Sequence, residues 1–329
     1  MFKQLLTIGG LSILSLTALQ AQQVGQFSQY VQNPLILNPA ATGIYEYTDI
    51  NLSMRRQWTG LDDAPNTYYL SVNSRLKKKN TTPYYTPSLR TSQGNTAIKK
   101  FTAPESGRIR HGLGGFLMMD EYGAFQKLTG NISYALHLPL GEQLYFSVGA
   151  GVGASNLSFD RDNISLTNQV DNTYNQFIAN GTNSTYLNLN LGGWLYTDRF
   201  FLGYNTNQLL GDALAFGDGL NYEELELHHY ATVGYKIKAG DNFDITPSAM
   251  LKFLNPSPPS FDLTLKAEYK EQFWAGVSYR NQDAIIGLVG FNINNFFKLG
   301  YSYDFSISDL SSYNSGGHEI VLGIMLGRN

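Results

Sequence analysis

The sequence predicts an all-β protein, a transmembrane antiparallel β-barrel of fourteen strands, and three observations support this fold class. Apolar and polar residues alternate with a period of two in segment after segment, which is typical of strands with one apolar face. The segments are about 9 to 13 residues long, and about 9 to 11 tilted residues cross a bilayer. Charged residues make up 15% of the chain and aromatic residues 13%, whereas roughly 25% of the residues in ordinary soluble proteins are charged.

The composition excludes several other classes of protein. A mean hydropathy of -0.22 is too low for a bundle of membrane-spanning helices. The net charge of -3 argues against nucleic acid as a partner, because nucleic-acid binding requires a basic surface. The chain has no cysteine, which excludes disulfides, a cysteine nucleophile and a lipid anchor on an N-terminal cysteine.

Residues 1–21 have the organisation of a secretory signal peptide. Lys3 supplies a positive charge, an apolar stretch runs from Leu5 to Leu16, and small residues lead to a predicted cleavage site after Ala21. The alternative is an N-terminal membrane anchor, but this stretch is too short for the roughly 30 Å of a bilayer core. We therefore expect the mature chain to lie outside the cytoplasm.

The next element, residues 22–45, is predicted to be an extended segment at or inside the barrel lumen. Pro34 and Pro39 lack amide hydrogens and restrict the residues before them, so neither a regular helix nor a central strand fits. The apolar residues of this segment require burial, and the segment directly precedes the first predicted strand. We expect it to line or partly plug the lumen.

Residues 46–329 form the predicted barrel, and an even number of strands agrees with closed bacterial barrels. A soluble β-sandwich is the alternative, since alternation alone does not tell which face is buried. Strand length, aromatic content and the signal peptide favour the membrane barrel. The strands are predicted at 46–58, 66–76, 109–120, 124–139, 142–159, 183–196, 199–208, 226–238, 242–253, 261–270, 272–280, 283–292, 296–306 and 318–327.

The predicted connections sort by length. Those after strands four, six, eight, ten and twelve are short, whereas 160–182, 209–225 and 307–317 are long. Bacterial barrels have short periplasmic turns and longer outer loops. We therefore expect both ends of the chain to face the periplasm.

The connection 77–108 breaks this rule, because it is long although it lies on the predicted periplasmic side. Glu105 is its one acidic residue, and its composition predicts a disordered insert or an arm that folds on contact with a partner. Docking to an acidic periplasmic partner and a solvated linker are the two alternatives. The candidate docking residues are Lys77, Lys78, Lys79, Lys99 and Lys100.

No motif in the sequence predicts catalysis, a metal site or a cofactor. Gly149, Gly151 and Gly153 lack the helix that follows a dinucleotide-binding loop, and on one face of a strand such small residues allow close packing. The five histidines do not have metal-binding spacing, and Asp62 with Asp63 offers too few oxygens for calcium. No GxSxG motif occurs. We expect a protein that is not an enzyme.

Two N-terminal blocks carry a family resemblance. Residues 22–43 read QQVGQFSQYVQNPLILNPAATG, and residues 55–72 read RRQWTGLDDAPNTYYLSV. With the glycine-rich strand and DEYG turn of 112–125, they resemble the PorP/SprF family of type IX secretion membrane proteins. The matching positions are Gln26, Phe27, Ser28, Gln29, Tyr30, Asn33, Pro34, Asn38, Pro39, Ala40, Gly43, Arg56, Gln57, Trp58, Ala64 and Pro65.

The resemblance implies an outer-membrane barrel of the type IX secretion and gliding machinery in a Gram-negative, Bacteroidetes-like bacterium. Such a barrel helps to export a large secreted adhesin, or anchors it at the surface, by binding its C-terminal domain. Periplasmic components of the machinery and the lipid bilayer are the other implied partners. Apolar residues of the predicted outer loops are candidate cargo contacts, with packing inside the loops as the alternative. They are Tyr174, Phe177, Ile178, Leu210, Leu214 and Phe216.

A passive porin or small-molecule uptake channel is the second functional hypothesis. Barrels of this size can enclose a pore for small solutes. The predicted inward faces hold many Gly, Ser, Asn and Tyr residues and only scattered lysines. This composition favours a filled or narrow lumen over an open, charge-lined one.

Overall fold

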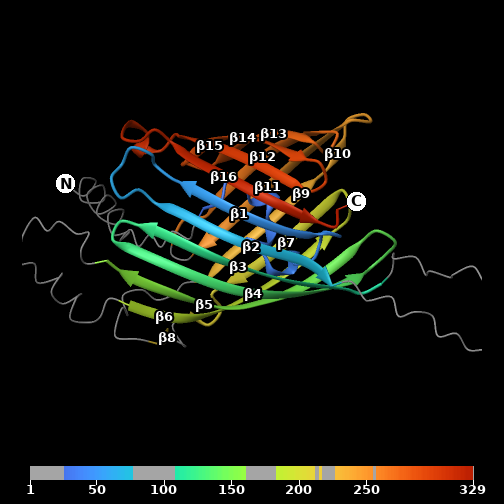
Figure 1. Ribbon diagram of the computed structural model, residues 1–329, viewed down its shortest axis with the longest axis horizontal. Helices are drawn as coiled ribbons and strands as arrows, with labels where there is room; N and C mark the ends of the chain where they lie inside the picture. Colours follow the sequence, from blue (N-terminus) through green and yellow to red (C-terminus); the bar gives the residue numbers. More distant parts are fainter. Residues whose placement is uncertain are drawn as a thin grey trace, which may run out of the picture.

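The computed structural model describes residues 26–76, 108–160, 183–211, 215–216, 227–254 and 257–328, which form an antiparallel β-barrel (Figure 1). Neighbouring strands pair in chain order, and β16 pairs with β1 to close the ring. Both β9 and β10 pair with β11 as halves of one barrel strand, and β8 pairs only with β6, so the barrel has fourteen strands. The strands are β1 (Thr48–Arg56), β2 (Asn66–Leu76), β3 (Arg110–Tyr122), β4 (Phe125–Pro139), β5 (Tyr145–Phe159), β6 (Asn183–Tyr196), β7 (Phe200–Asn207), β8 (Ala215–Phe216), β9 (His228–Tyr235), β10 (Ile237–Lys238), β11 (Phe243–Leu254), β12 (Ser260–Tyr269), β13 (Phe273–Arg280), β14 (Ala284–Ile293), β15 (Phe297–Ser306) and β16 (Gly317–Leu326).

The fold class predicted from the alternation is confirmed, and each of the fourteen predicted strands is present. Strands β2 and β6 begin and end at the predicted residues. The start of β5 differs most, because the prediction begins at residue 142 and the strand at Tyr145. The amide of Leu140 donates to the carbonyl of Leu144 at 2.8 Å, which closes a turn where the prediction continued the strand.

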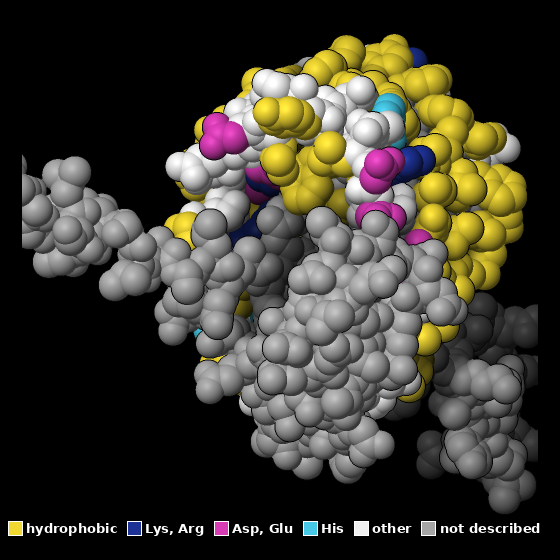
Figure 2. Space-filling view, turned by 90° about the vertical axis from the view of Figure 1, so that its left-hand side faces the viewer, with side chains coloured by type: hydrophobic (Ala, Val, Ile, Leu, Met, Phe, Trp, Pro, Cys, Tyr) yellow, Lys and Arg dark blue, Asp and Glu magenta, His cyan; other side chains and the backbone are white. Residues whose placement is uncertain are grey.

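The burial pattern of the strands shows which face meets the lipid. In β1, Leu52 and Met54 are 53% and 48% exposed, whereas the alternating residues Asn51 and Ser53 are buried. The apolar side chains therefore point outward and the polar ones inward, as in a membrane barrel and not in a soluble sandwich. Apolar side chains cover the outer wall at the right of Figure 2, which looks along the barrel axis. No described residue belongs to a helix long and apolar enough to cross a bilayer.

The two open ends of the barrel differ in their connections. We call one end the turn mouth, which carries the turns 140–144, 197–199, 239–242, 270–272 and 294–296 and the last described residue, Arg328. The other end is the loop mouth, which carries the connections 57–65, 123–124, 160–182, 208–227, 255–259, 281–283 and 307–316. The long connections predicted at 160–182, 209–225 and 307–317 all belong to the loop mouth.

Residues 26–43, which we call the lumen segment, lie inside the barrel, as predicted (Figure 1). The segment is not extended, because it forms three 3-10 turns, η1 (Tyr30–Gln32), η2 (Pro34–Ile36) and η3 (Pro39–Ala41). Pro34 and Pro39 each occupy the first position of a turn, where the missing amide hydrogen costs nothing and the fixed φ angle is favourable. The prolines thus start short turns rather than an extended path.

The lumen segment runs from the loop mouth to the turn mouth. At the loop mouth, Gln26 contacts Arg280 at the end of β13, and near the turn mouth Gly43 contacts Asn73 of β2. The first and last barrel strands do begin and end at one mouth. Gln26, the first described residue, lies at the loop mouth because the lumen segment turns back through the barrel. The N-terminal end of the chain itself lies outside the described residues.

Candidate functional site

The lumen segment and the wall around it form the candidate functional site, since they bring together most residues of the N-terminal motif. Gln26 is half-buried, and the other motif residues of the segment are buried. They are Phe27, Ser28, Gln29, Tyr30, Asn33, Pro34, Asn38, Pro39 and Ala40.

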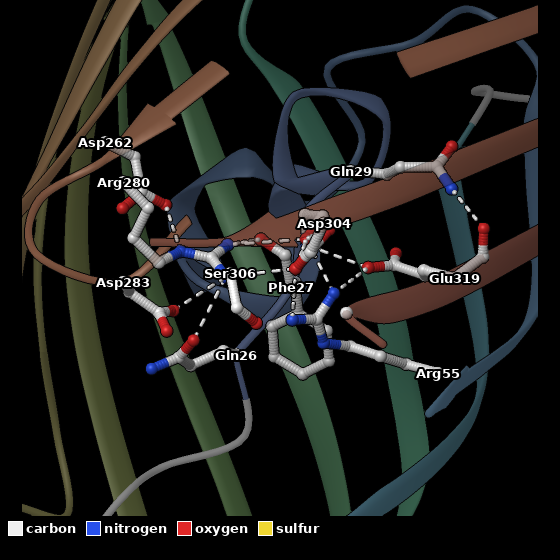
Figure 3. A network of polar contacts seen from close by, with 12 residues as sticks. Gln26, Phe27, Gln29, Arg55, Asp262, Arg280, Asp283, Asp304, Ser306 and Glu319 are labelled. Atoms are coloured by element: carbon white, nitrogen blue, oxygen red, sulfur yellow. Dashed lines mark hydrogen bonds and ion pairs between the residues drawn. The ribbon is translucent and has the colours of Figure 1, made fainter. Parts of the chain in front are cut away.

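Five charged side chains of the wall form a buried cluster near the loop mouth, which we call the charge cluster (Figure 3). They are Arg55 of β1, Asp262 of β12, Arg280 of β13, Asp304 of β15 and Glu319 of β16. An Nη atom of Arg55 lies 2.7 Å from Asp304 and another lies 3.4 Å from Glu319. Arg280 lies 3.4 Å from both Asp262 and Asp304. Buried charges need such partners because desolvation is costly.

Ser28 of the lumen segment completes the hydrogen bonding of the charge cluster. Its amide donates to Glu319 Oε2 at 2.7 Å, and its hydroxyl donates to Asp304 Oδ1 at 2.9 Å. The same hydroxyl accepts from Arg55 Nη1 at 2.6 Å. Figure 3 shows Gln26 beside the guanidinium of Arg280, whose Nη1 donates to Gln26 Oε1 at 3.0 Å. The start of the lumen segment is therefore bound by charged groups from four strands.

Apolar side chains hold the middle of the lumen segment. Phe27, Tyr30, Ile36 and Leu37 pack with Tyr69, Tyr230 and Met250 of the wall. The rings of Phe27 and Tyr69 meet edge to face, with centroids 5.6 Å apart, a favoured aromatic geometry. The Tyr30 hydroxyl lies 3.3 Å from that of Thr264.

Polar contacts fix the end of the lumen segment near the turn mouth. Asn38 Nδ2 donates to the carbonyl of Gly193 at 3.2 Å, and its Oδ1 accepts from the amide of Ala40 at 2.9 Å. Ser147 donates to the carbonyl of Ala40 at 2.7 Å. His137 Nε2 lies 2.7 Å from the carbonyl of Thr42, so the imidazole carries its hydrogen on Nε2.

Wall glycines let the lumen segment approach closely. A Cβ atom added at Gly149 would overlap the backbone of Pro39 and Ala40, and one added at Gly112 would overlap Thr42. Side chains at these positions would therefore displace the segment. The lumen-facing Gly149 has the close-packing role predicted for it.

A cavity of about 610 Å³, which we call the vestibule, lies between the lumen segment and the turn mouth. Its lining includes Tyr45, Tyr47, Arg75 and Arg110. Burial raises the pKa values of Tyr45 and Tyr47, so both hydroxyls stay neutral at physiological pH. Arg75 is not free to bind a ligand, because it donates to the carbonyl of Gly43 at 3.1 Å and pairs with Glu46 at 3.0 Å.

The other predicted site residues do not join the lumen segment. Arg56 is exposed. The backbone N–H of Gln57 donates to the carbonyl of Pro65, and Trp58 has a φ angle of 46°. All three lie where β1 ends and the turn 57–65 begins at the loop mouth. Backbone hydrogen bonds of Thr59 with Ser315 and Gly316, both 2.7 Å, join this turn to the connection 307–316.

Of the predicted cargo contacts, Leu210 is half-buried after β7, and the backbone of Phe216 pairs with Thr185. Tyr174, Phe177, Ile178, Leu214, Lys77, Lys78, Lys79, Lys99 and Lys100 lie outside the described residues, as does the predicted signal peptide.

Histidines and acids do not gather into a metal site in the described part of the chain. His111, His137 and His229 instead place Nδ1 2.6, 2.9 and 2.9 Å from a tyrosine hydroxyl. The charge cluster, by contrast, was missed in the sequence. Its only signal there is a charged residue at an inward position of each of five separate strands.

Comparison with known proteins identifies the family. The sequence matches the family model of the type IX secretion system membrane protein PorP/SprF over residues 19–324. The chain belongs to the PorP/SprF family. This PorP/SprF protein is an integral outer-membrane barrel, and its family links it to the secretion machinery.

Several solved barrels are similar in fold to this PorP/SprF protein. The Pseudomonas putida toluene transporter TodX is 10% identical with a TM-score of 0.48, over 93% of this chain and 95% of TodX. A TodX deltaS2S3 mutant is 11% identical with a TM-score of 0.50, over 89% and 93%. The Ralstonia pickettii toluene transporter TbuX is 11% identical with a TM-score of 0.45, over 90% and 93%. No curated protein matches the chain.

Proposed function

We propose that the protein is a non-enzymatic barrel of the type IX secretion and gliding machinery that binds the C-terminal domain of a large secreted adhesin. Binding would help to export the adhesin or anchor it at the surface. The filled lumen is the observation that carries this proposal. The lumen segment is buried along the barrel and is held at one end by hydrogen bonds to charged side chains of the wall, which favours docking over the passage of solutes.

The connection 307–316 supplies a docking surface at the loop mouth. Leu310 and Tyr313 are 40% and 72% exposed in it. Exposed apolar clusters of this kind are typical of protein-binding surfaces. The hydrogen bonds of Thr59 with Ser315 and Gly316 fix the end of this connection to the turn 57–65. The long loops 160–182 and 209–225 would contribute further contacts.

Purification from native cells in mild detergent, followed by mass spectrometry of bound chains, tests cargo binding. We expect the C-terminal fragment of a large adhesin in the wild-type sample. Changing Leu310 and Tyr313 together to serine should lower its recovery about tenfold, as for central interface residues. Asp309→Ser, a polar change in the same connection, is the control. Recovery of a cargo-free, conducting barrel would contradict the proposal.

The orientation in the membrane follows from the lengths of the connections. We propose that the loop mouth faces the cell exterior and the turn mouth the periplasm. A protease added to intact cells should cleave within 160–182 or 208–227 and spare the turn 197–199. Cleavage at 197–199 with both loops intact would reverse the orientation.

In this orientation the basic insert 77–108 starts in the periplasm, because β2 and β3 have those ends at the turn mouth. Its lysines would dock to an acidic component of the machinery. The alternative is that the insert is a solvated linker, with which the same composition also agrees.

A passive uptake channel is the second candidate function. The vestibule favours it, since a volume of about 610 Å³ lies within the range of small-molecule sites. Passage of a solute through the barrel would require the lumen segment to move out of the lumen. The conductance measurement described in the Discussion separates the two functions.

A further inference from the structure

The lipid-facing wall has a groove of about 410 Å³ near the turn mouth, across strands β11 to β15. Its lining consists of apolar and aromatic residues. Most residues of its lining belong to the outer surface of the barrel, whereas Trp274 is buried and Gly290 packs against it. The groove shares no lining residue with the vestibule. Because this surface meets the bilayer, the groove is continuous with the lipid interface.

The strand register explains the rim of the groove. Five large side chains from neighbouring strands lie directly opposite one another and form a single row. The row consists of Phe243, Tyr269, Phe273, Phe291 and Leu299. The turn 270–272 joins two strands of this row at the turn mouth, which is the depth at which membrane barrels carry an aromatic girdle.

The register also explains why the wall is hollow beside this row. The next lipid-facing row toward the loop mouth contains Ala267, Ala275, Val289 and Tyr301. Two adjacent alanines stand where the neighbouring row has Tyr269 and Phe273. Alanine fills much less space, so a depression forms between the aromatic rim and the larger side chains farther along the strands.

A free positive charge lies at the membrane edge of the groove. Lys270, at the tip of the turn 270–272, has its Nζ 5.4 Å from the centre of the Tyr269 ring. It forms no ion pair within the described ranges, whereas the adjacent Glu271 pairs with Arg328 at 3.0 Å. Lys270 and Glu271 have φ angles of 50° and 54°, a region that is unfavourable for side chains of this size.

We infer that one membrane phospholipid binds here, with an acyl chain in the groove and its phosphate beside Lys270. The all-apolar lining matches a hydrocarbon chain, and the lysine at the rim matches an anionic headgroup. The groove would hold this lipid longer than lipids that contact the wall outside it. The turn mouth would then meet the phospholipid leaflet.

Native mass spectrometry of the full barrel, after washing in a delipidating detergent, tests the inference. We expect one phospholipid to stay bound to the wild type. Ala275→Leu, which fills the groove, should lower lipid occupancy at least about tenfold. Lys270→Gln should lower it about fivefold through the lost headgroup contact.

Ala231→Leu is the control, because Ala231 is a lipid-facing alanine of β9 away from the groove. It should keep the wild-type occupancy, and heat-modifiable migration on gels should show that every variant is folded. The inference fails if the wild type retains no lipid or retains lipopolysaccharide. It also fails if Ala231→Leu loses as much lipid as Ala275→Leu.

Discussion

Deletion of residues 22–43 is expected to turn a closed barrel into an ion-conducting pore. The lumen segment fills the barrel from Gln26 at the loop mouth to Gly43 near the turn mouth, and a barrel of fourteen strands has room for a channel without it. Single-channel recordings in planar bilayers should show no current steps for the wild-type protein and stable current steps for the deletion variant. If a folded deletion variant shows no current steps, the prediction that the lumen segment closes the pore is contradicted.

A single substitution tests the same prediction without removing the segment. Gly149→Val places a side chain where the backbone of Pro39 and Ala40 lies, so it should force the segment away and raise the conductance. Gly287→Val is the matched control, because a Cβ atom there meets nothing within 4 Å. Conducting wild-type protein would instead support the channel hypothesis.

Arg55→Ala is expected to destabilise the barrel by about 3–5 kcal/mol, the usual cost of leaving a buried charge without its partner. Arg55 is 2% exposed, and its removal leaves Asp304 and Glu319 without their 2.7 and 3.4 Å contacts. The hydroxyl of Ser28 also loses a donor. Urea unfolding in detergent micelles, followed by tryptophan fluorescence, measures the change in free energy.

The neighbouring Arg56 provides the control on the same strand. It is exposed and has no ion pair in the described part of the chain, so Arg56→Ala should change the free energy of unfolding by about 0.5 kcal/mol or less. Equal effects of the two substitutions would show that the charge cluster does not stabilise the fold.

Much of the fold could be read from the sequence because it depends on local alternation. In β1 the residues Asn51 to Met54 already alternate between polar and apolar, and the strand pairs on both sides as this pattern requires. The boundary with the largest error is the start of β5, where a backbone hydrogen bond closes the turn 140–144. The family, too, was visible in the motif of the lumen segment.

The path and conformation of the lumen segment could not be read in the same way. The sequence showed that Pro34 and Pro39 exclude a regular helix and a central strand. It did not show the 3-10 turns or the direction of the segment. Those depend on partners such as Glu319, which is 291 positions from Ser28, and on glycines of the wall that leave room for the backbone.

The sequence by itself determined the alternating strands and the family, because a period of two and a local motif need no distant partner. Strand length, aromatic content and the signal peptide favoured a membrane barrel over a soluble sandwich. Only the tertiary structure decided how the interior is used. Closure between β16 and β1 brings Glu319 next to Arg55, and the ring places Arg280 and Asp304 beside them. In a low-dielectric interior these charges stabilise the fold only where they form ion pairs with one another. The alternation along each separate strand does not show which charged residues will pair.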